Sequence, residues 1–100
     1  MIPDIPFNRW SIERIKYGVK CCTARTKKYE VEGVTHIERM DLETVRNSYW
    51  RQEGANSPEE FEKVWKSIHP NRGFVGTDKV YVHWFENPYK EGKDDTNRKV

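Results

Sequence analysis

The sequence has few cysteines, and their positions argue against a disulfide-stabilised or zinc-binding protein. Cys21 and Cys22 are the only two, and they are neighbours in the chain. A disulfide between neighbours is strained and closes no useful loop, and two thiols without further ligands make a poor zinc site. We therefore predict reduced cysteines that fill space on a strand, no metal and no cofactor. A redox or metal role for the pair is the open alternative.

Long apolar runs are also absent. No stretch approaches the roughly 20 apolar residues that span a bilayer. Residues 1–6 lack the basic start and the apolar stretch of a secretory signal. We therefore expect a cytoplasmic protein with no membrane partner.

Apolar residues are scarce overall, at 35% of the chain, but 13% of the residues are aromatic. Because each buried aromatic ring removes a large apolar area from water, we expect a core of a few rings with Val and Ile. A chain of 100 residues is one domain's worth. Residues 87–100 are almost wholly polar or charged, which predicts a domain over residues 1–86 and a mobile C-terminal tail.

Charge is unevenly distributed along the chain. Residues 9–28 hold seven Lys or Arg against one acid, whereas residues 29–64 hold nine acids against four basic residues. The formal net charge of the whole chain is only +2. One basic segment in a nearly neutral protein concentrates its field on one region, which suits an anionic partner. A solvated, charged surface without a partner is the alternative.

Capping residues and periodic apolar positions predict two helices in the first half of the chain. Asn8 caps the first, which ends at Gly18, and Asp41 caps the second, which ends by Glu53. Their apolar positions recur at helical spacing: Trp10, Ile12 and Ile15 in the first, and Leu42, Val45 and Tyr49 in the second.

A third helix has the clearest local signal. Ser57 is its cap, Pro58 takes the first helical position, and Glu60 completes a capping box. Residues 69–73 end it. We interpret its apolar stripe as core rather than as a cofactor face: Phe61, Val64, Trp65 and Ile68.

Three strands are predicted, over residues 20–25, 34–40 and 79–85. The last alternates cleanly, and both of its faces are largely apolar, so we expect it to be the central strand of a sheet or small barrel. His83 lies within it. We interpret His83 as a packed, hydrogen-bonded histidine rather than a ligand or a base.

The stretch from Gly18 to Arg25 carries the most chemistry. On a strand, Thr23 and Arg25 lie on one face with Cys21 beside them. Lys20 is out of phase and joins that face only if the backbone twists at the preceding turn, which Gly18 permits. An arginine fork, a compact ammonium and a hydroxyl would then converge on phosphate or base oxygens.

Nearby residues favour a nucleic-acid ligand. Lys27 and Lys28 follow in a polar turn, and Trp10, Tyr17 and Tyr29 offer surfaces on which a base can stack. The predicted partner is RNA or a modified nucleoside. The alternative is an exposed edge strand with ordinary surface charges.

The motifs also agree in order with a known family. Gly-x-Lys-x-x-Thr-x-Arg at 18–25 precedes Lys-Lys-Tyr at 27–29, Gln-Glu-Gly at 52–54, Ser-Pro-Glu-Glu-Phe at 57–61 and Val-Tyr-Val-His at 80–83. From Phe7 to Phe85 this series resembles the ASCH domain of the PUA-like superfamily. The resemblance implies an α+β fold, a small mixed β-barrel flanked by two to three helices, with a cleft lined by residues 18–25. Family members are proposed to bind RNA, and one bacterial branch hydrolyses the acetyl amide of N4-acetylcytidine.

The resemblance also implies catalytic residues. The lysine, threonine and glutamate of that branch fall on Lys20, Thr23 and Glu53. Thr23 would be the nucleophile, with Lys20 or Glu53 as its base. A Lys20–Glu53 ion pair at the mouth of the cleft is the alternative. Residues 29–40 depart from the family pattern: the barrel either has one strand fewer or forms the missing Gly-Asp turn at residues 32–33.

Three functions follow from these observations. We favour a module with a basic cleft that binds RNA or a nucleoside. The second is a small amidohydrolase that deacylates nucleosides such as N4-acetylcytidine, and the third is a protein-interaction domain without catalysis. The predicted catalytic residues are Lys20, Thr23 and Glu53, and the predicted binding residues are Arg25, Lys20, Lys27, Lys28, Trp10 and Tyr29.

Overall fold

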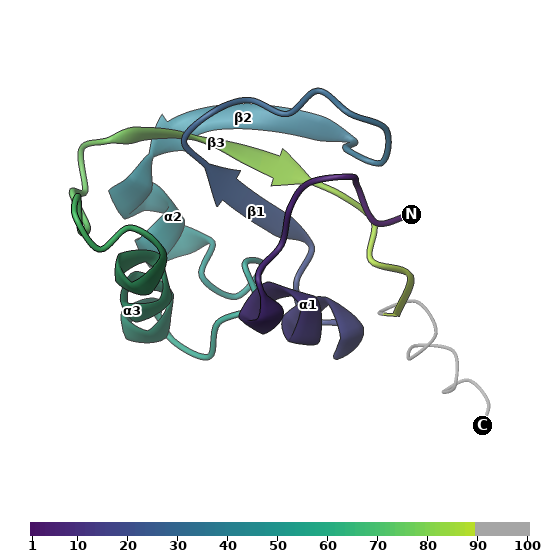
Figure 1. Cartoon of the computed structure of the whole chain (residues 1–100), viewed down its shortest axis with the longest axis horizontal. Helices are drawn as coiled ribbons and strands as arrows, with labels where there is room; N and C mark the ends of the chain where they lie inside the picture. Colours follow the sequence, from purple (N-terminus) through teal and green to yellow (C-terminus); the bar gives the residue numbers. More distant parts are fainter. Residues whose placement is uncertain (90–100) are drawn as a thin grey trace.

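An antiparallel sheet of three strands lies at the centre of the computed structural model, which describes residues 1–89 (Figure 1). The strands are β1 (Cys22–Arg25), β2 (His36–Asp41) and β3 (Lys79–Trp84), in the order β1-β3-β2. The expected central position of the last strand is confirmed. Within the described residues the sheet is open, so the structure confirms a mixed α+β domain and contains no closed barrel there.

Three helices accompany the sheet: α1 (Arg9–Lys16), α2 (Leu42–Ser48) and α3 (Pro58–Ile68). Figure 1 shows α2 and α3 together on one side and α1 below the start of β1. None of the helices within residues 1–89 has the length and apolar character needed to cross a membrane.

The hydrophobic core lies between one face of the sheet and the pair α2 and α3. Alternation along the strands places the small apolar side chains of β1 and β3 on this face. Leu42 and Val45 from α2 are completely buried against them. The remaining members of the core are Cys22, Ala24, Ala55, Phe61, Trp65, Val80 and Val82.

Side-chain caps fix the starts of α1 and α3 as predicted. The Asn8 side chain accepts a hydrogen bond from the Ser11 amide at 2.8 Å, and Ser57 Oγ accepts one from the Glu60 amide at 3.0 Å. Glu60 differs slightly from a standard capping box, because its carboxylate accepts from the Asn56 amide. It also contacts Arg14 at 3.4 Å, which ties α3 to α1.

Several predicted boundaries shift. The second helix ends at Ser48, within the predicted limit at Glu53 but five residues before it. The Asp41 carboxylate does not cap it, since it is paired with Lys79. The first strand begins at Cys22, not at residue 20. Because Lys20 therefore lies before the strand, the alternation of the strand does not fix the direction of its side chain.

The predicted tail, residues 87–100, lies mostly outside the described residues. Its first residue, Asn87, is buried. The side-chain Nδ2 of Asn87 donates to the carbonyl oxygens of Ile15 and Lys20 at 2.9 and 2.8 Å. Asn87 thus links the end of α1 to the segment that enters β1.

Candidate functional site

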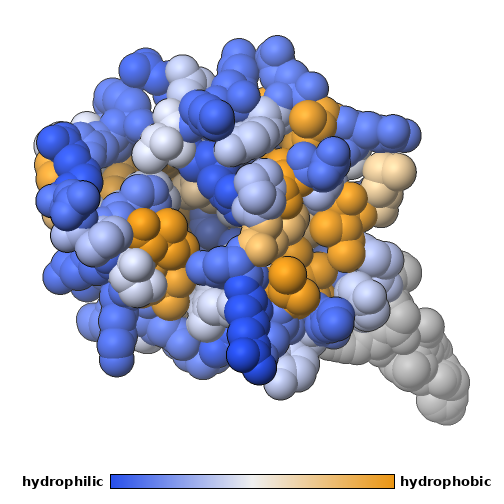
Figure 2. All heavy atoms as spheres, in the orientation of Figure 1, coloured by the Kyte–Doolittle hydropathy of each residue, from blue (hydrophilic) through white to orange (hydrophobic). Residues whose placement is uncertain are grey.

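A cavity of about 300 Å³ lies beside β1, between the start of α1, the helix α3 and the segment that follows β1. Figure 2 shows this face of the molecule hollowed between α3 and β1, with polar and apolar residues around the opening. The residues that line the cavity include Lys20, Thr23, Arg25 and Glu53. The structure therefore brings together the four side chains on which the sequence hypothesis depends.

The cavity follows the outer edge of β1. Thr23 and Ala24 both line it although alternation puts their side chains on opposite faces of the sheet. The Cys21 carbonyl accepts from the Phe85 amide, and the Cys22 amide donates away from the sheet to the Gln52 carbonyl. By the same alternation, the peptide groups of Ala24 point outward, so the cavity also offers a backbone donor and acceptor.

Lys20 reaches the cavity through the turn that precedes β1. Gly18 adopts a φ of +81°, which a residue with a Cβ rarely tolerates. The Val19 and Lys20 amides then both donate to the Arg14 carbonyl, folding the chain back on α1. The predicted twist at Gly18 is thus present.

Lys20 and Glu53 form a buried ion pair. Lys20 Nζ donates to Glu53 Oε1 and to the Glu53 carbonyl oxygen, both at 2.9 Å. The two residues are only 1% and 3% exposed. Charges this deeply buried are retained only when well paired. The Lys20–Glu53 ion pair, given above as the alternative to a catalytic role, is present, but it lies in the wall of the cavity rather than at an exposed mouth.

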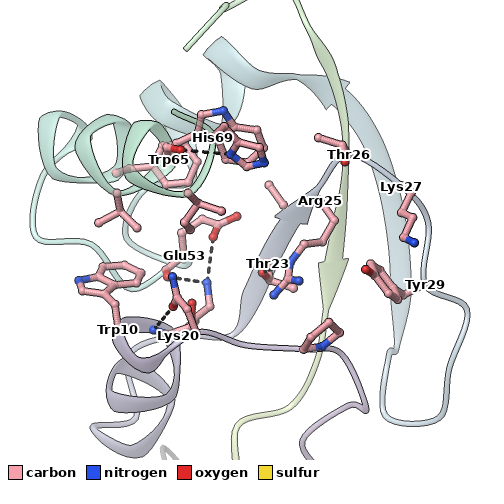
Figure 3. Close-up of a pocket in the computed structure, with 17 residues that line it drawn as sticks. Trp10, Lys20, Thr23, Arg25, Thr26, Lys27, Tyr29, Glu53, Trp65 and His69 are labelled. Atoms are coloured by element: carbon pink, nitrogen blue, oxygen red, sulfur yellow. Dashed lines mark hydrogen bonds and ion pairs between the residues drawn. The ribbon is translucent and has the colours of Figure 1, made fainter. Parts of the chain in front are cut away.

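The second carboxylate oxygen of Glu53 has no such partner. Glu53 Oε2 and Gln52 Oε1 are the two buried side-chain oxygens without a hydrogen bond within residues 1–89. Of the two residues, Glu53 lines the cavity, and Figure 3 shows its carboxylate facing the space between α3 and β1. A buried acceptor without a donor costs free energy, so this oxygen is prepared for a donor from a ligand or from water.

Arg25 is held rigidly beside Thr23. Its Nε donates to Thr23 Oγ1 at 3.1 Å, and its guanidinium carbon lies 5.2 Å from the Phe7 ring centre and 6.0 Å from that of Tyr29. Burial lowers the pKa of Arg25 from its ordinary value, although the group stays charged. No ion pair neutralises Arg25 among the described residues; its nearby carboxylate, Glu53, is bonded to Lys20.

His83 connects two residues of the cavity wall, Tyr29 and Thr23, through hydrogen bonds to their backbones. Its Nε2 accepts a hydrogen bond from the Tyr29 amide at 2.8 Å. Because that nitrogen is an acceptor, Nδ1 carries the proton and donates to the Thr23 carbonyl at 3.2 Å. His83 is completely buried, and burial lowers the pKa of its imidazole. The interpretation of His83 as a packed, hydrogen-bonded histidine is confirmed.

Aromatic rings form the rest of the wall, as predicted for Trp10 and Tyr29. The Trp10 ring centre lies 5.8 Å from Lys20 Nζ, and the Tyr29 ring centre lies 5.5 Å from Lys27 Nζ. Tyr17, proposed as a further stacking surface, does not line the cavity and is 65% exposed. Lys27 lines the cavity, whereas Lys28 lies outside it and pairs with Glu30 at 3.5 Å.

The contribution of α3 to the cavity was not predicted from the sequence. Trp65 and His69 stack with ring centres 4.1 Å apart, and both line the cavity (Figure 3). His69 Nδ1 donates to the Trp65 carbonyl at 3.1 Å, since a carbonyl can only accept, which leaves Nε2 to face other partners. Trp65 belongs to the core as predicted. Periodicity alone does not reveal that a core ring also borders a cavity.

The basic segment is largely neutralised in the fold. Of its seven cationic side chains, four form ion pairs: Arg9, Arg14, Lys20 and Lys28. Glu60 and Glu53, the partners of Arg14 and Lys20, come from the acidic part of the chain. The positive charge that is left at the cavity belongs to Arg25 and Lys27.

The two cysteines do not form a disulfide. Cys22 is completely buried in the core, and burial raises the pKa of its thiol well above the ordinary value. Cys21 is partly exposed. A space-filling role is therefore confirmed for Cys22.

Comparison of the chain with family models, with curated proteins and with solved structures finds no match. The features that bear on function are therefore those of the cavity: its aromatic walls, its buried ion pair, its unpartnered carboxylate oxygen and its two remaining cations.

Proposed function

We propose that the protein is an ASCH-type module that binds RNA or a modified nucleoside in the cavity beside β1. The observation that carries the proposal is Glu53 Oε2, a buried carboxylate oxygen without a donor in a cavity with aromatic walls. Membership of the ASCH family, with the small β-barrel of that family, is also part of the proposal and rests on the sequence resemblance alone.

The polar groups of the cavity suit a flat heterocycle. Glu53 Oε2 requires an N–H or O–H donor, and every nucleobase presents an N–H group on its pairing edge. The outward peptide groups of Ala24 and the hydroxyl of Thr23 supply further donors and acceptors at the same cavity.

The aromatic walls suit the faces of such a ring. Trp10, Tyr29 and Trp65 all line the cavity. Stacking of a base on an aromatic side chain contributes about 1–3 kcal/mol and tolerates any base. The walls and polar groups together favour a single unstacked base over a duplex, whose bases are not accessible to a cavity.

Binding of RNA or nucleosides to a Tyr29→Ala variant tests this proposal. We expect loss of the Tyr29 wall to weaken binding by about tenfold, since one stacking contact is removed. Tyr17→Ala is the matched control, because Tyr17 lies outside the cavity. Affinities would be measured by calorimetry with the four ribonucleosides, N4-acetylcytidine and a short single-stranded RNA. Equal affinities of the two variants, or no binding to wild type, would refute the proposal.

A second function is favoured by one specific observation: Lys20, Thr23 and Glu53 line the same cavity. In this alternative the protein is an amidohydrolase that acts on N4-acetylcytidine or similar nucleosides. Thr23 Oγ1 attacks the acetyl carbon and passes its proton to Glu53, and the C–N bond then breaks as the amine takes that proton. The ammonium of Lys20 stabilises the oxyanion, and water hydrolyses the acetyl ester.

Release of cytidine from N4-acetylcytidine, followed by chromatography, tests the alternative. Thr23→Val should abolish release, whereas Thr23→Ser should retain part of it, because serine keeps the hydroxyl. Glu53→Gln should also abolish release. Absence of turnover in the wild type removes this alternative and leaves the binding module; absence of both turnover and binding leaves the protein-interaction domain.

A further inference from the structure

Two cations of the cavity have no acidic partner, and they indicate the class of ligand, provided that the proposed function holds. Arg25 and Lys27 both line the cavity, and neither forms an ion pair within residues 1–89. Lys28, next to them in sequence, is paired with Glu30 and lies outside.

Arg25 is already held in one orientation beside the cavity. Its Nε is engaged by Thr23 Oγ1, and its guanidinium lies near the rings of Phe7 and Tyr29. Tyr29 is a further side-chain hydrogen-bond partner of the guanidinium. Because a guanidinium has five N–H donors, donors remain for an oxyanion. A preorganised guanidinium loses little entropy when it binds an oxyanion in a bidentate manner. Burial lowers the pKa of Arg25, so its charge is held where an anion would stabilise it.

The charge balance of the cavity indicates the kind of anion. Lys20 and Glu53 neutralise each other. Arg25 and Lys27 therefore leave two positive charges at the cavity. A phosphate monoester carries about −1.5 to −2 at neutral pH, whereas each internal phosphodiester of RNA carries a single charge. The monoester matches the two cations more closely.

The size of the cavity points to a small ligand. Its volume of about 300 Å³ lies at the lower end of the range for small-molecule sites, which is roughly 300–1,000 Å³. One nucleotide, rather than several, suits such a volume. We infer that the ligand is a mononucleotide: its terminal phosphate binds Arg25 and Lys27, and its base lies against the aromatic walls with an N–H group directed to Glu53 Oε2.

Paired titrations of nucleosides and their 5′-monophosphates test the inference. Calorimetry with cytidine, uridine, adenosine and guanosine and with the four monophosphates would give the affinity gained from the phosphate. We expect at least one monophosphate to bind about tenfold or more tightly than its nucleoside, because a charge-assisted hydrogen bond contributes about 1.5–3 kcal/mol. This gain should decrease as salt increases.

Variants of Arg25 and Lys27 test whether these two cations provide the affinity gained from the phosphate. Arg25→Gln and Lys27→Gln should each remove most of it, so that each variant binds a monophosphate little more tightly than it binds the corresponding nucleoside. Arg39→Gln is the matched control, since Arg39 lies on β2, is exposed and does not line the cavity. Circular dichroism and thermal unfolding establish that each variant is folded. Lys27 is exposed, so its variant remains informative even if Arg25→Gln is unstable.

The outcomes separate this inference from the proposed function. Equal affinity for nucleosides and monophosphates overturns the inference and leaves the proposed function intact. An RNA oligonucleotide without a terminal phosphate that binds more tightly than every monophosphate also overturns the inference, in favour of RNA. No binding of nucleosides, monophosphates or RNA overturns both.

Discussion

The ammonium of Lys20 lies 2.9 Å from two oxygens of Glu53, a residue 33 positions further along the chain. One of these oxygens is the backbone carbonyl and the other belongs to the carboxylate. The contact therefore joins the turn before β1 to the turn after α2. The other carboxylate oxygen of Glu53 has no hydrogen-bond donor within residues 1–89.

Removing one partner of this pair should strongly destabilise the protein. Lys20→Met leaves the carboxylate of Glu53 buried without a counter-charge, and we expect a loss of about 3–5 kcal/mol in the free energy of unfolding. Lys66→Met is the control, because Lys66 pairs with Glu62 on the surface and an exposed pair contributes about 0–1 kcal/mol. Urea unfolding followed by tryptophan fluorescence gives both values. Similar losses for the two variants would contradict the assignment of a buried pair.

Gly54 should be far less tolerant of substitution than Gly73. Both have positive φ, +99° and +70°. A Cβ at Gly54 would lie 2.9 Å from Arg14 Cβ and 3.1 Å from Lys20 Cβ, whereas one at Gly73 meets nothing within 4 Å. Gly54→Ala thus combines backbone strain with overpacking, and we expect it to cost about 1–3 kcal/mol more than Gly73→Ala. Urea midpoints of the two variants measure this difference, and equal midpoints would refute it.

The main features of the fold were predictable because they depend on local signals. The caps at Asn8 and Ser57 require only a side chain near the first amides of a helix. The central position of β3 followed from its two apolar faces, and the burial of His83 followed from that position. These are short-range relationships that a sequence records directly.

The candidate site was predictable only in part. Lys20, Thr23 and Arg25 are close in sequence, so alternation and the turn at Gly18 were sufficient to group them. The grouping with Glu53 came from the family resemblance, since no local pattern joins residues so far apart. The cavity wall from α3 was missed because a core ring and a cavity ring show the same helical spacing.

The charge of the site was overestimated from sequence for a related reason. A count along residues 9–28 does not show which cations meet acids after folding. Arg14 pairs with Glu60, and Lys20 pairs with Glu53. Long-range ion pairs thus reduced a broad basic segment to a local site at Arg25 and Lys27.

Cys22 should resist thiol reagents in the folded protein. It is completely buried, and burial raises the pKa of its thiol, so little of the reactive thiolate forms near neutral pH. We expect iodoacetamide at pH 7.5 to modify Cys21, which is partly exposed, well before Cys22. Mass spectrometry of peptides locates the label, and a sample in urea is the control in which both residues react. Equal labelling rates in the folded protein would contradict the burial of Cys22.

His83 should make the stability of the protein depend on pH between about 5 and 7. Burial lowers the pKa of its imidazole below the ordinary value of 6.5. As the pH falls through 6.5, His83 binds a proton in the unfolded chain but not yet in the folded protein, so the free energy of unfolding decreases. At pH 7.5 and above the imidazole is neutral in both states, and this contribution is complete.

The contribution of His83 to the pH dependence of stability can be separated from the contribution of the carboxylates. Hydrogen bonds from Arg46 and Arg72 lower the pKa of Glu62 and Asp78, so these acids lose their stabilising charge only below about pH 4.5. In His83→Gln, an amide oxygen can replace Nε2 as acceptor for the Tyr29 amide, and nothing titrates. We expect this variant to lose most of the decrease in stability between pH 7.5 and 5, measured by urea unfolding. His36→Gln, at an exposed position on β2, should retain it. An unchanged pH profile in His83→Gln would show that another group carries the effect.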